Sequence, residues 1–313
     1  MGKATRAAYG ETLVELVQEG LDIVAVEADL SGSTTTAKLG EAYPDRLFNA
    51  GIAEANMTDV AAGFAHEGKI AFTGSFAVFG TGRAWEQVRN TVCLNNLNVK
   101  LAPTHAGVTV GPDGGSHQAL EDIALMRVLP NMKVLVPADY HAAKSAIRLA
   151  AQTPGPFYVR LGRMNVDNVY DEGFELELGK AYVLRDGTDV TITACGLEVA
   201  EALKAAEILA SEGIQAEVID VASIKPLDVD TLVASVRKTG CIVTCEEHSV
   251  LGGMGSAISE VLSELCPVPT RRIGVADMFG VSGDPEKLIK HFNLDAPSIA
   301  EAARELAGLQ VSA

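Results

Sequence analysis

Residues 104–118 form a glycine-rich stretch with the sequence Thr-His-Ala-Gly-Val-Thr-Val-Gly-Pro-Asp-Gly-Gly-Ser-His-Gln. His105 and His117 lie twelve residues apart in it, with Asp113 between them. So many glycines and polar side chains make a poor buried strand, so we predict a loop. The simplest interpretation is a solvated loop with incidental polar residues, and the alternative is a functional loop.

The segments around this stretch alternate between short apolar runs and amphipathic helices. Predicted strands cover residues 23–26, 70–72, 99–102, 133–136 and 157–159, and predicted helices cover 54–66, 83–94, 121–129 and 141–152. A second series has strands at 189–194, 216–220 and 241–245 and helices at 198–212, 229–238 and 256–265. Such alternation is typical of parallel sheets covered on both faces. We therefore predict an α/β fold of two domains, each a mostly parallel sheet flanked by helices.

A polar, acidic segment separates the two series. Residues 165–178 contain five acidic side chains and show no strong helical period. We therefore predict a first domain at residues 1–165, a linker at 166–182 and a second domain at 183–313, which agrees with the usual size of domains.

The composition of the 313 residues, with 48% hydrophobic and 21% charged side chains, is typical of a globular protein. The formal net charge of −16 disfavours nucleic acid and anionic membranes as partners, although local Arg and His residues still permit an anionic substrate. Neither a membrane span nor a signal peptide is recognisable, so we expect a cytoplasmic protein. Cys241, Cys245 and His248 have loosely metal-like spacing, but the apolar residues between the cysteines favour a buried strand, so no metal site is predicted.

Two further groups precede the glycine-rich stretch. Glu54 follows a glycine turn, in the sequence Asn-Ala-Gly-Ile-Ala-Glu-Ala-Asn-Met of residues 49–57. A carboxylate at a helix N-terminus gains a few tenths to about 1 kcal/mol, which explains Glu54 structurally. Phe76 and Phe79 belong to Ser-Phe-Ala-Val-Phe, residues 75–79, and core packing is the simplest explanation for them.

Taken in order, the three groups resemble the transketolase family. The resemblance covers almost the whole chain, but only the pyrimidine-binding and C-terminal domains of that family. In the second half it falls on Glu-Glu-His at 246–248 and Gly-Gly-Met-Gly at 252–255. It implies thiamine diphosphate as cofactor, with Glu54 hydrogen-bonded to the aminopyrimidine ring. A carboxyl group there shares a proton with a ring nitrogen and so promotes formation of the ylid, which makes Glu54 a catalytic candidate.

The same resemblance implies further cofactor contacts. Phe76 and Phe79 would form the apolar pocket for the pyrimidine ring. Asp29 and Leu30 would touch the cofactor, with Leu30 as a wedge that keeps it bent. Many relatives have a third aromatic residue where this chain has Gly82, so the pocket is expected to be more open.

By the same match, residues 104–118 correspond to the family's substrate loop. His105 and His117 would hydrogen-bond the oxygens or the phosphate of a sugar, and both are catalytic candidates because histidine can also move protons near neutral pH. Asp113 would accept a hydrogen bond from the hydroxyl next to the donor's carbonyl. A site built to bind a hydroxyl rejects analogues that lack it, which suits a ketose.

Three more residues fit a phosphorylated substrate. Arg160 and Arg163 follow the strand at 157–159, and a guanidinium binds phosphate in bidentate fashion. A surface arginine pair at the end of the sheet is the alternative. Ser33 lies where relatives place another phosphate contact. Arg83 and Trp85 lie in the helix after the phenylalanines and receive no role.

One element of the family is missing from this chain. Full-length members bind the diphosphate and Mg²⁺ through Gly-Asp-Gly and an asparagine about thirty residues later, and no such pair occurs here. The resemblance therefore implies a separate N-terminal, diphosphate-binding subunit that supplies most of the Mg²⁺ site. Twofold symmetry then suggests an α2β2 heterotetramer with contacts between β subunits.

The leading hypothesis is transfer of a two-carbon ketol unit from a ketose phosphate to an aldose. The alternatives are a deoxyxylulose phosphate synthase-like subunit using pyruvate, a subunit like the β chain of 2-oxo acid dehydrogenase E1, and a non-catalytic paralogue. His105 and Asp113 fit a polyhydroxylated donor and so oppose the E1 alternative, whereas Glu54 opposes the non-catalytic one. The sugar pair stays open between general pentose phosphates and a specialised catabolic sugar.

Overall fold

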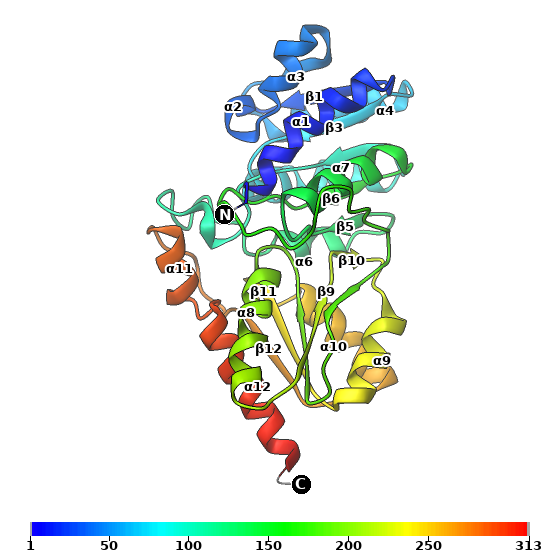
Figure 1. Cartoon of the computed structure of the whole chain (residues 1–313). Helices are drawn as coiled ribbons and strands as arrows, with labels where there is room; N and C mark the ends of the chain where they lie inside the picture. Colours follow the sequence, from blue (N-terminus) through cyan, green and yellow to red (C-terminus); the bar gives the residue numbers. More distant parts are fainter. Residues whose placement is uncertain (1, 312–313) are drawn as a thin grey trace.

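The computed structural model describes residues 2–311 and contains two sheets, each flanked by helices (Figure 1). The seven-stranded sheet consists, in spatial order, of β10 (Ser223–Lys225), β5 (Lys133–Leu135), β6 (Phe157–Val159), β4 (Val99–Leu101), β3 (Ile70–Gly74), β1 (Ile23–Glu27) and β2 (Leu47–Asn49). All its neighbouring strands are parallel except β10 and β5. This arrangement confirms the first of the two predicted α/β units.

The first half of the chain supplies most of the helices around this sheet. They are α1 (Thr5–Gln18), α2 (Ser31–Thr34), α3 (Ala37–Ala42), α4 (Glu54–His66), α5 (Trp85–Gln87), α6 (Asp122–Arg127) and α7 (Tyr140–Gln152). Short turns of other helix types are η1 (Pro44–Arg46), η2 (Val78–Arg83), η3 (Val88–Cys93) and η4 (Val108–Val110). The side chains of Leu13 and Ile147, from α1 and α7, pack with Phe72 and Phe157 of the sheet in one fully buried cluster. Covering helices of this kind explain why the strands carry continuous apolar runs.

The second sheet has five strands and lies below the first in Figure 1. In spatial order they are β12 (Thr270–Val275), β11 (Ile242–Ser249), β8 (Val190–Ala194), β9 (Ala216–Asp220) and β7 (Tyr182–Arg185), of which only β7 is antiparallel to its neighbour. Its helices are α8 (Glu198–Ser211), α9 (Val229–Thr239), α10 (Met254–Leu265), α11 (Pro285–His291) and α12 (Ala296–Val311). The predicted second α/β unit is therefore also confirmed.

Two features differ from the elements expected from the sequence. The helix predicted at residues 83–94 is divided, because η2 and η3 are π-helical and only α5 between them is α-helical. Such wide turns are frequent at functional sites. In addition, β10 comes from the second half of the chain but pairs with β5 at the edge of the first sheet. No sequence pattern indicated that a strand from the second half of the chain would join the first sheet.

The segment predicted as a linker, 166–182, packs against both domains. The rings of Tyr170 and Phe174 stack with their centroids 3.6 Å apart, and the Tyr170 hydroxyl donates to Asp220 at 2.8 Å. The amide of Leu176 donates to Ser145 of α7. Aromatic residues thus anchor this acidic stretch. No helix within residues 2–311 has the length and apolar character needed to cross a membrane.

Candidate functional site

The glycine-rich stretch at residues 104–118, called the central loop below, lies where two parallel strands end. Because β3 and β4 are adjacent, the segments after them meet, and Phe76 forms a backbone bridge with Thr104. The ring of His105 then stacks on Phe76, with centroids 3.9 Å apart and planes at 22°. His105 is only 3% exposed and has a φ of 61°, a conformation that few non-glycine residues adopt. The structure therefore buries His105 against an aromatic ring.

His117 and Phe79 complete a cluster of four rings. The chain returns so that Ala106 pairs with Ala119, which brings His117 back to the start of the loop. The ring centroids of His117 and Phe79 lie 5.3 Å apart in an edge-to-face arrangement, and the rings of Phe76 and Phe79 are nearly parallel with centroids 6.1 Å apart. Four residues predicted from sequence for the cofactor and the substrate are thus brought together, with Phe79 and His117 partly exposed.

Arg6 and Thr104 fix the state of His105. The His105 Nε2 atom lies 3.3 Å from an Arg6 nitrogen, and Nδ1 lies 2.7 Å from the Thr104 hydroxyl. A guanidinium only donates, so Nε2 accepts and Nδ1 carries the proton. Burial, with Arg6, Arg163 and His117 nearby, lowers the pKa of His105 to about 3. His105 is therefore a neutral imidazole with one defined tautomer at physiological pH.

Glu54 begins α4 and lies beside the same rings. Its side chain is 1% exposed, and Oε2 accepts a hydrogen bond of 2.8 Å from Arg83. The Arg83 guanidinium also lies 5.0 Å from the centroid of Phe79, as in a cation–π contact. Since one guanidinium touches both Glu54 and Phe79, the carboxylate and the rings border the same space. Arg83, which the sequence left without a role, connects them.

Asp113 and Arg163 lie on the exposed part of the central loop. Arg163 donates to the Val110 carbonyl at 2.5 Å and lies 3.8 Å from the Asp113 carboxylate. Both side chains are more than one-third exposed. Their contact is a loose surface ion pair of the kind that contributes little to stability, so both groups are accessible to a ligand.

The turn after β1 approaches the same site from another strand end. Arg6, the partner of His105, also donates to the backbone carbonyl of Ser33 at 2.9 Å, which places this turn next to the histidine. Asp29, with a φ of 62°, exchanges hydrogen bonds with Asn49 through its amide and its carboxylate. Leu30 is partly exposed at the start of α2. Ser33 therefore adjoins the site, and Asp29 and Leu30 lie on the turn leading to it.

Arg160 does not belong to this cluster. It is 7% exposed and forms an ion pair with Asp122, with Nε 2.6 Å from a carboxylate oxygen. It also donates to the backbone carbonyls of Ala119 and Glu247 at 3.3 and 2.9 Å. A guanidinium with these partners is a structural group inside the protein, so the arrangement gives no support to the substrate contact expected for Arg160.

No sequence pattern indicated that Arg6 and Thr104 would contact the His105 ring. Arg6 is about a hundred residues before His105 and belongs to α1, whose only visible pattern was its helical period. Nothing in one sequence shows that this helix begins beside the central loop.

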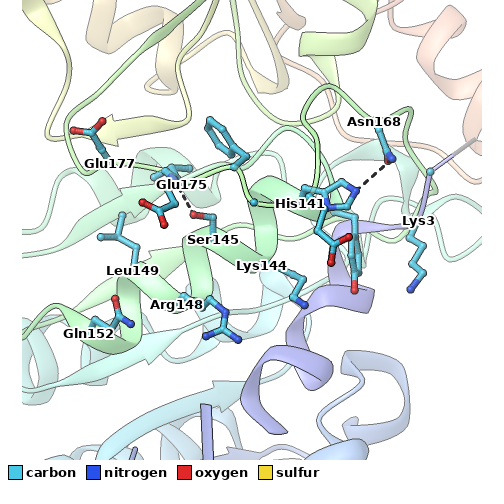
Figure 2. Close-up of a pocket in the computed structure, with 16 residues that line it drawn as sticks. Lys3, His141, Lys144, Ser145, Arg148, Leu149, Gln152, Asn168, Glu175 and Glu177 are labelled. Carbon is cyan, nitrogen blue, oxygen red and sulfur yellow. Dashed lines mark hydrogen bonds between the residues drawn. The ribbon is translucent and has the colours of Figure 1, made fainter. Parts of the chain in front are cut away.

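A separate groove with a volume of about 950 Å³ lies along α7 (Figure 2). Its cations Lys144 and Arg148 form ion pairs with Glu15 and Glu19 of α1. Because these charges are already neutralised, the groove shows no unpaired positive centre for an anionic substrate. It is lined by none of the residues singled out from the sequence.

The chemistry of the ring cluster fits an aminopyrimidine. Arg83 bonds only Oε2 of the buried Glu54 carboxylate, so Oε1 is available to a ligand. Phe79 offers a partly exposed aromatic ring beside the same guanidinium. These two features are what a flat, basic heterocycle requires. Among residues 2–311, no group of three or more His, Cys, Asp or Glu side chains is placed to hold a metal ion. Cys241 and Cys245 are free and buried, at and within β11, as the apolar sequence predicted.

The fold and this site define a subunit of an enzyme that uses a thiamine-type cofactor. Residues 1–168 match the pyrimidine-binding domain of transketolase, and residues 179–299 match the transketolase C-terminal domain. The chain therefore belongs to the transketolase family and corresponds to the C-terminal section of a split transketolase. The pyrimidine-binding domain implies thiamine diphosphate.

Known proteins of similar length support this assignment. A protein of Methanocaldococcus jannaschii, provisionally named a transketolase C-terminal section, is 48% identical over 97% of this chain and 96% of its own length. A 6-deoxy-6-sulfo-D-fructose transketolase subunit of a Clostridium species is 44% identical over 96% of this chain and 94% of its own. The solved structure of a split-gene transketolase, described as an inactive β4 tetramer, superposes with a TM-score of 0.90, at 50% identity and 99% coverage of both chains.

Proposed function

We propose that this chain is the catalytic C-terminal subunit of a transketolase that moves a two-carbon ketol unit from a ketose phosphate to an aldose. The observation that carries the proposal is the position of Arg83, which contacts both the Glu54 carboxylate and the ring of Phe79. Carboxylate, aromatic rings and the two histidines consequently border one space. A carboxylate and rings suit the cofactor, and the histidines suit a sugar.

Each residue has a defined task in this proposal. Thiamine diphosphate, when bound, supplies the nucleophilic carbon that attacks the ketose carbonyl. Glu54 holds a proton at Oε1 against a ring nitrogen, while Phe76 and Phe79 provide the apolar surface for the ring. The neutral His105 ring has an unprotonated Nε2, which accepts a hydrogen bond from a sugar hydroxyl when that hydroxyl replaces Arg6 as the donor. His117 lies against the same Phe76 ring.

The substrate contacts are proposed on exposure and charge. Asp113 is exposed and accepts from the donor's hydroxyl, and Arg163 binds the phosphate. Arg6 is an additional phosphate candidate, because it lies between His105 and the Ser33 carbonyl and keeps its charge in any physiological buffer. Arg160 is left out of these contacts for the reasons given above.

The active enzyme requires a second chain in this proposal. A diphosphate-binding N-terminal subunit provides most of the Mg²⁺ site, and the two chains assemble as an α2β2 heterotetramer in the cytoplasm. Support comes from the related split-gene transketolase structure, which is described as an inactive β4 tetramer. The donor could be a phosphorylated or a sulfonated ketose, since one relative is named for a sulfonated fructose.

The decisive test is reconstitution. The chain alone and the chain mixed with its diphosphate-binding partner are assayed with thiamine diphosphate, Mg²⁺, xylulose 5-phosphate and ribose 5-phosphate. We expect ketol transfer only in the mixture. A complex that forms but transfers nothing from any ketose, including sulfonated ones, would contradict the proposal, and pyruvate is then the next donor to test.

Within an active complex, Asp113→Asn should raise the KM for the ketose donor by about tenfold, because the amide loses the charge that strengthens the hydroxyl contact. His105→Gln should lower kcat/KM for the donor by a similar factor. Asp45→Asn, a change on an exposed turn far from the central loop in sequence, serves as the control. Unchanged donor kinetics in both site variants would remove these residues from the substrate contacts.

A further inference from the structure

The central loop is held by groups from the second half of the chain. Its Thr109 amide donates a buried hydrogen bond of 2.6 Å to Oε1 of Glu247, a residue of β11. Glu247 also fills the space beside Gly107, where a Cβ atom would lie 2.1 Å from the carboxyl carbon. With its φ of 81°, Gly107 is the residue type that permits this approach. The Glu247 carboxyl group therefore packs directly against the backbone of the central loop.

A second contact lies at the far side of the loop. The segment 280–283, between β12 and α11, donates from Ser282 Oγ to the Pro112 carbonyl at 2.6 Å. In the other direction, the side-chain amide of Gln118 donates to the carbonyl of Val281 at 3.0 Å. A Cβ atom at Gly115 would lie 2.5 Å from the carbonyl oxygen of Gly280, so the two backbones touch. The part of the loop that carries Asp113 and His117 thus lies on this segment.

Arg160 ties the first contact to the first domain. It donates to the Glu247 carbonyl and to the carbonyl of Ala119, the residue that closes the loop, while Asp122 neutralises its charge. Burial raises the pKa of the Glu247 carboxyl to about 7, although Arg160 opposes the shift. The carboxyl thus acts mainly as a hydrogen-bond acceptor, which a neutral amide can replace.

We propose that the C-terminal domain positions the substrate-binding loop, through Glu247 at Thr109 and through segment 280–283 at residues 111–118. Glu247 is a positioning residue, because it touches the loop and not the reacting atoms. In this proposal the C-terminal domain determines how tightly the donor is bound. The structural part of this inference is independent of the proposed function, and only its kinetic part rests on it.

The first experiment measures hydrogen exchange in the isolated full-length chain. Glu247→Ala should accelerate exchange in peptides covering 104–118 by about tenfold or more, because the loop loses its buried acceptor. Glu247→Gln keeps an acceptor oxygen and should restore protection. The control is Glu246→Ala: this neighbouring buried glutamate accepts instead from the amides of Met254 and Gly255, so its loss should expose α10 and leave the loop unchanged.

Ser282→Ala provides an independent variant in case Glu247→Ala does not fold. Its hydroxyl is exposed, so the fold should persist while exchange in residues 111–118 increases. Unchanged protection of the loop in Ser282→Ala, together with unchanged protection in a folded Glu247→Ala, would overturn the inference. Equal loosening by Glu246→Ala would also overturn it, because the effect would then be general destabilisation.

The second experiment uses the complete two-chain enzyme. Glu247→Ala should raise the KM for the ketose about 10- to 100-fold with a much smaller change in kcat, since misplacing a binding loop by even 1 Å weakens binding. Glu247→Gln should restore the KM. If loop protection falls but wild-type complexes transfer no ketol unit, the proposed function fails while the positioning role stands. If protection falls but the KM is unchanged, the loop does not bind the donor.

Discussion

Each of the two domains has a buried glutamate at the first position of a helix, and only one of these glutamates is part of a candidate site. Glu54 is the first residue of α4 and Glu198 is the first residue of α8. Each follows a glycine with positive φ, Gly51 at 76° and Gly196 at 61°, and each is almost completely buried. The two glutamates therefore share a helix start, a preceding glycine and burial, although the residue just before each helix differs in backbone conformation.

Their partners differ. Glu54 is paired with Arg83, a half-exposed cation that contacts the ring cluster. Glu198 has no hydrogen-bond partner on either carboxylate oxygen, and burial, reinforced by Glu247, raises its pKa well above the ordinary value. The helix N-terminus should favour a negative charge at both positions, so at Glu198 burial outweighs the helix dipole. The neighbouring cation, and not the position on the helix, distinguishes the candidate catalytic carboxylate of Glu54 from the buried acid Glu198.

The largest effect is expected at Glu54. Glu54→Gln keeps shape and burial but cannot share a proton with the cofactor ring, so turnover of the two-chain enzyme should fall by about 100-fold or more. Thermal unfolding of the chain should change little. The matched variant Glu198→Gln, also at the start of a helix, should retain activity. Similar losses in both variants would remove the functional distinction between the two helix starts.

The fold could be predicted because its signals are local. Residues 23–27 and 190–194 are fully buried strands, and continuous apolar runs separated by helices indicate a covered parallel sheet. The presence of β10 in the first sheet could not be predicted, because residues 223–225 pair with a strand about ninety positions earlier. Likewise, the π-helical turn at 88–93 has apolar residues at 88 and 92, the spacing of an ordinary helix.

The site could be predicted only where the types of residue in a motif indicated their chemistry. The resemblance selected His105 and His117, which the loop does bring to the same rings. It could not distinguish Arg160 from Arg163, three residues apart on one segment, because burial against Asp122 depends on the tertiary fold. Arg6 was missed for the same reason, since its contact with His105 joins segments 99 residues apart.

The intermediate effect is expected at Arg83. Arg83→Met leaves the buried Glu54 carboxylate without its charged donor, which should lower the free energy of unfolding by about 1–3 kcal/mol. In the Glu54→Gln background the same change should cost less, because a neutral amide needs no cation. Denaturant unfolding of the four proteins gives the coupling energy. Additive effects would mean that Arg83 does not stabilise Glu54.

The smallest effect, and the one that isolates the second helix start, is the pH dependence of Glu198→Gln. The folded protein keeps the Glu198 proton at pH values where the unfolded chain has released it, so the wild-type protein loses stability as pH rises above the ordinary glutamate range. The glutamine variant lacks this loss. Its advantage in the free energy of unfolding should be near zero at about pH 4 and should grow by at most about 1.4 kcal/mol per pH unit. Glu201→Gln, one turn further along α8, is the control, because that carboxylate already has Lys204 and the Ala296 amide as donors. An advantage for Glu198→Gln that does not change between pH 5 and 8 would show that the carboxyl is ionised when buried, and the contrast with Glu54 would then have to rest on Arg83 alone.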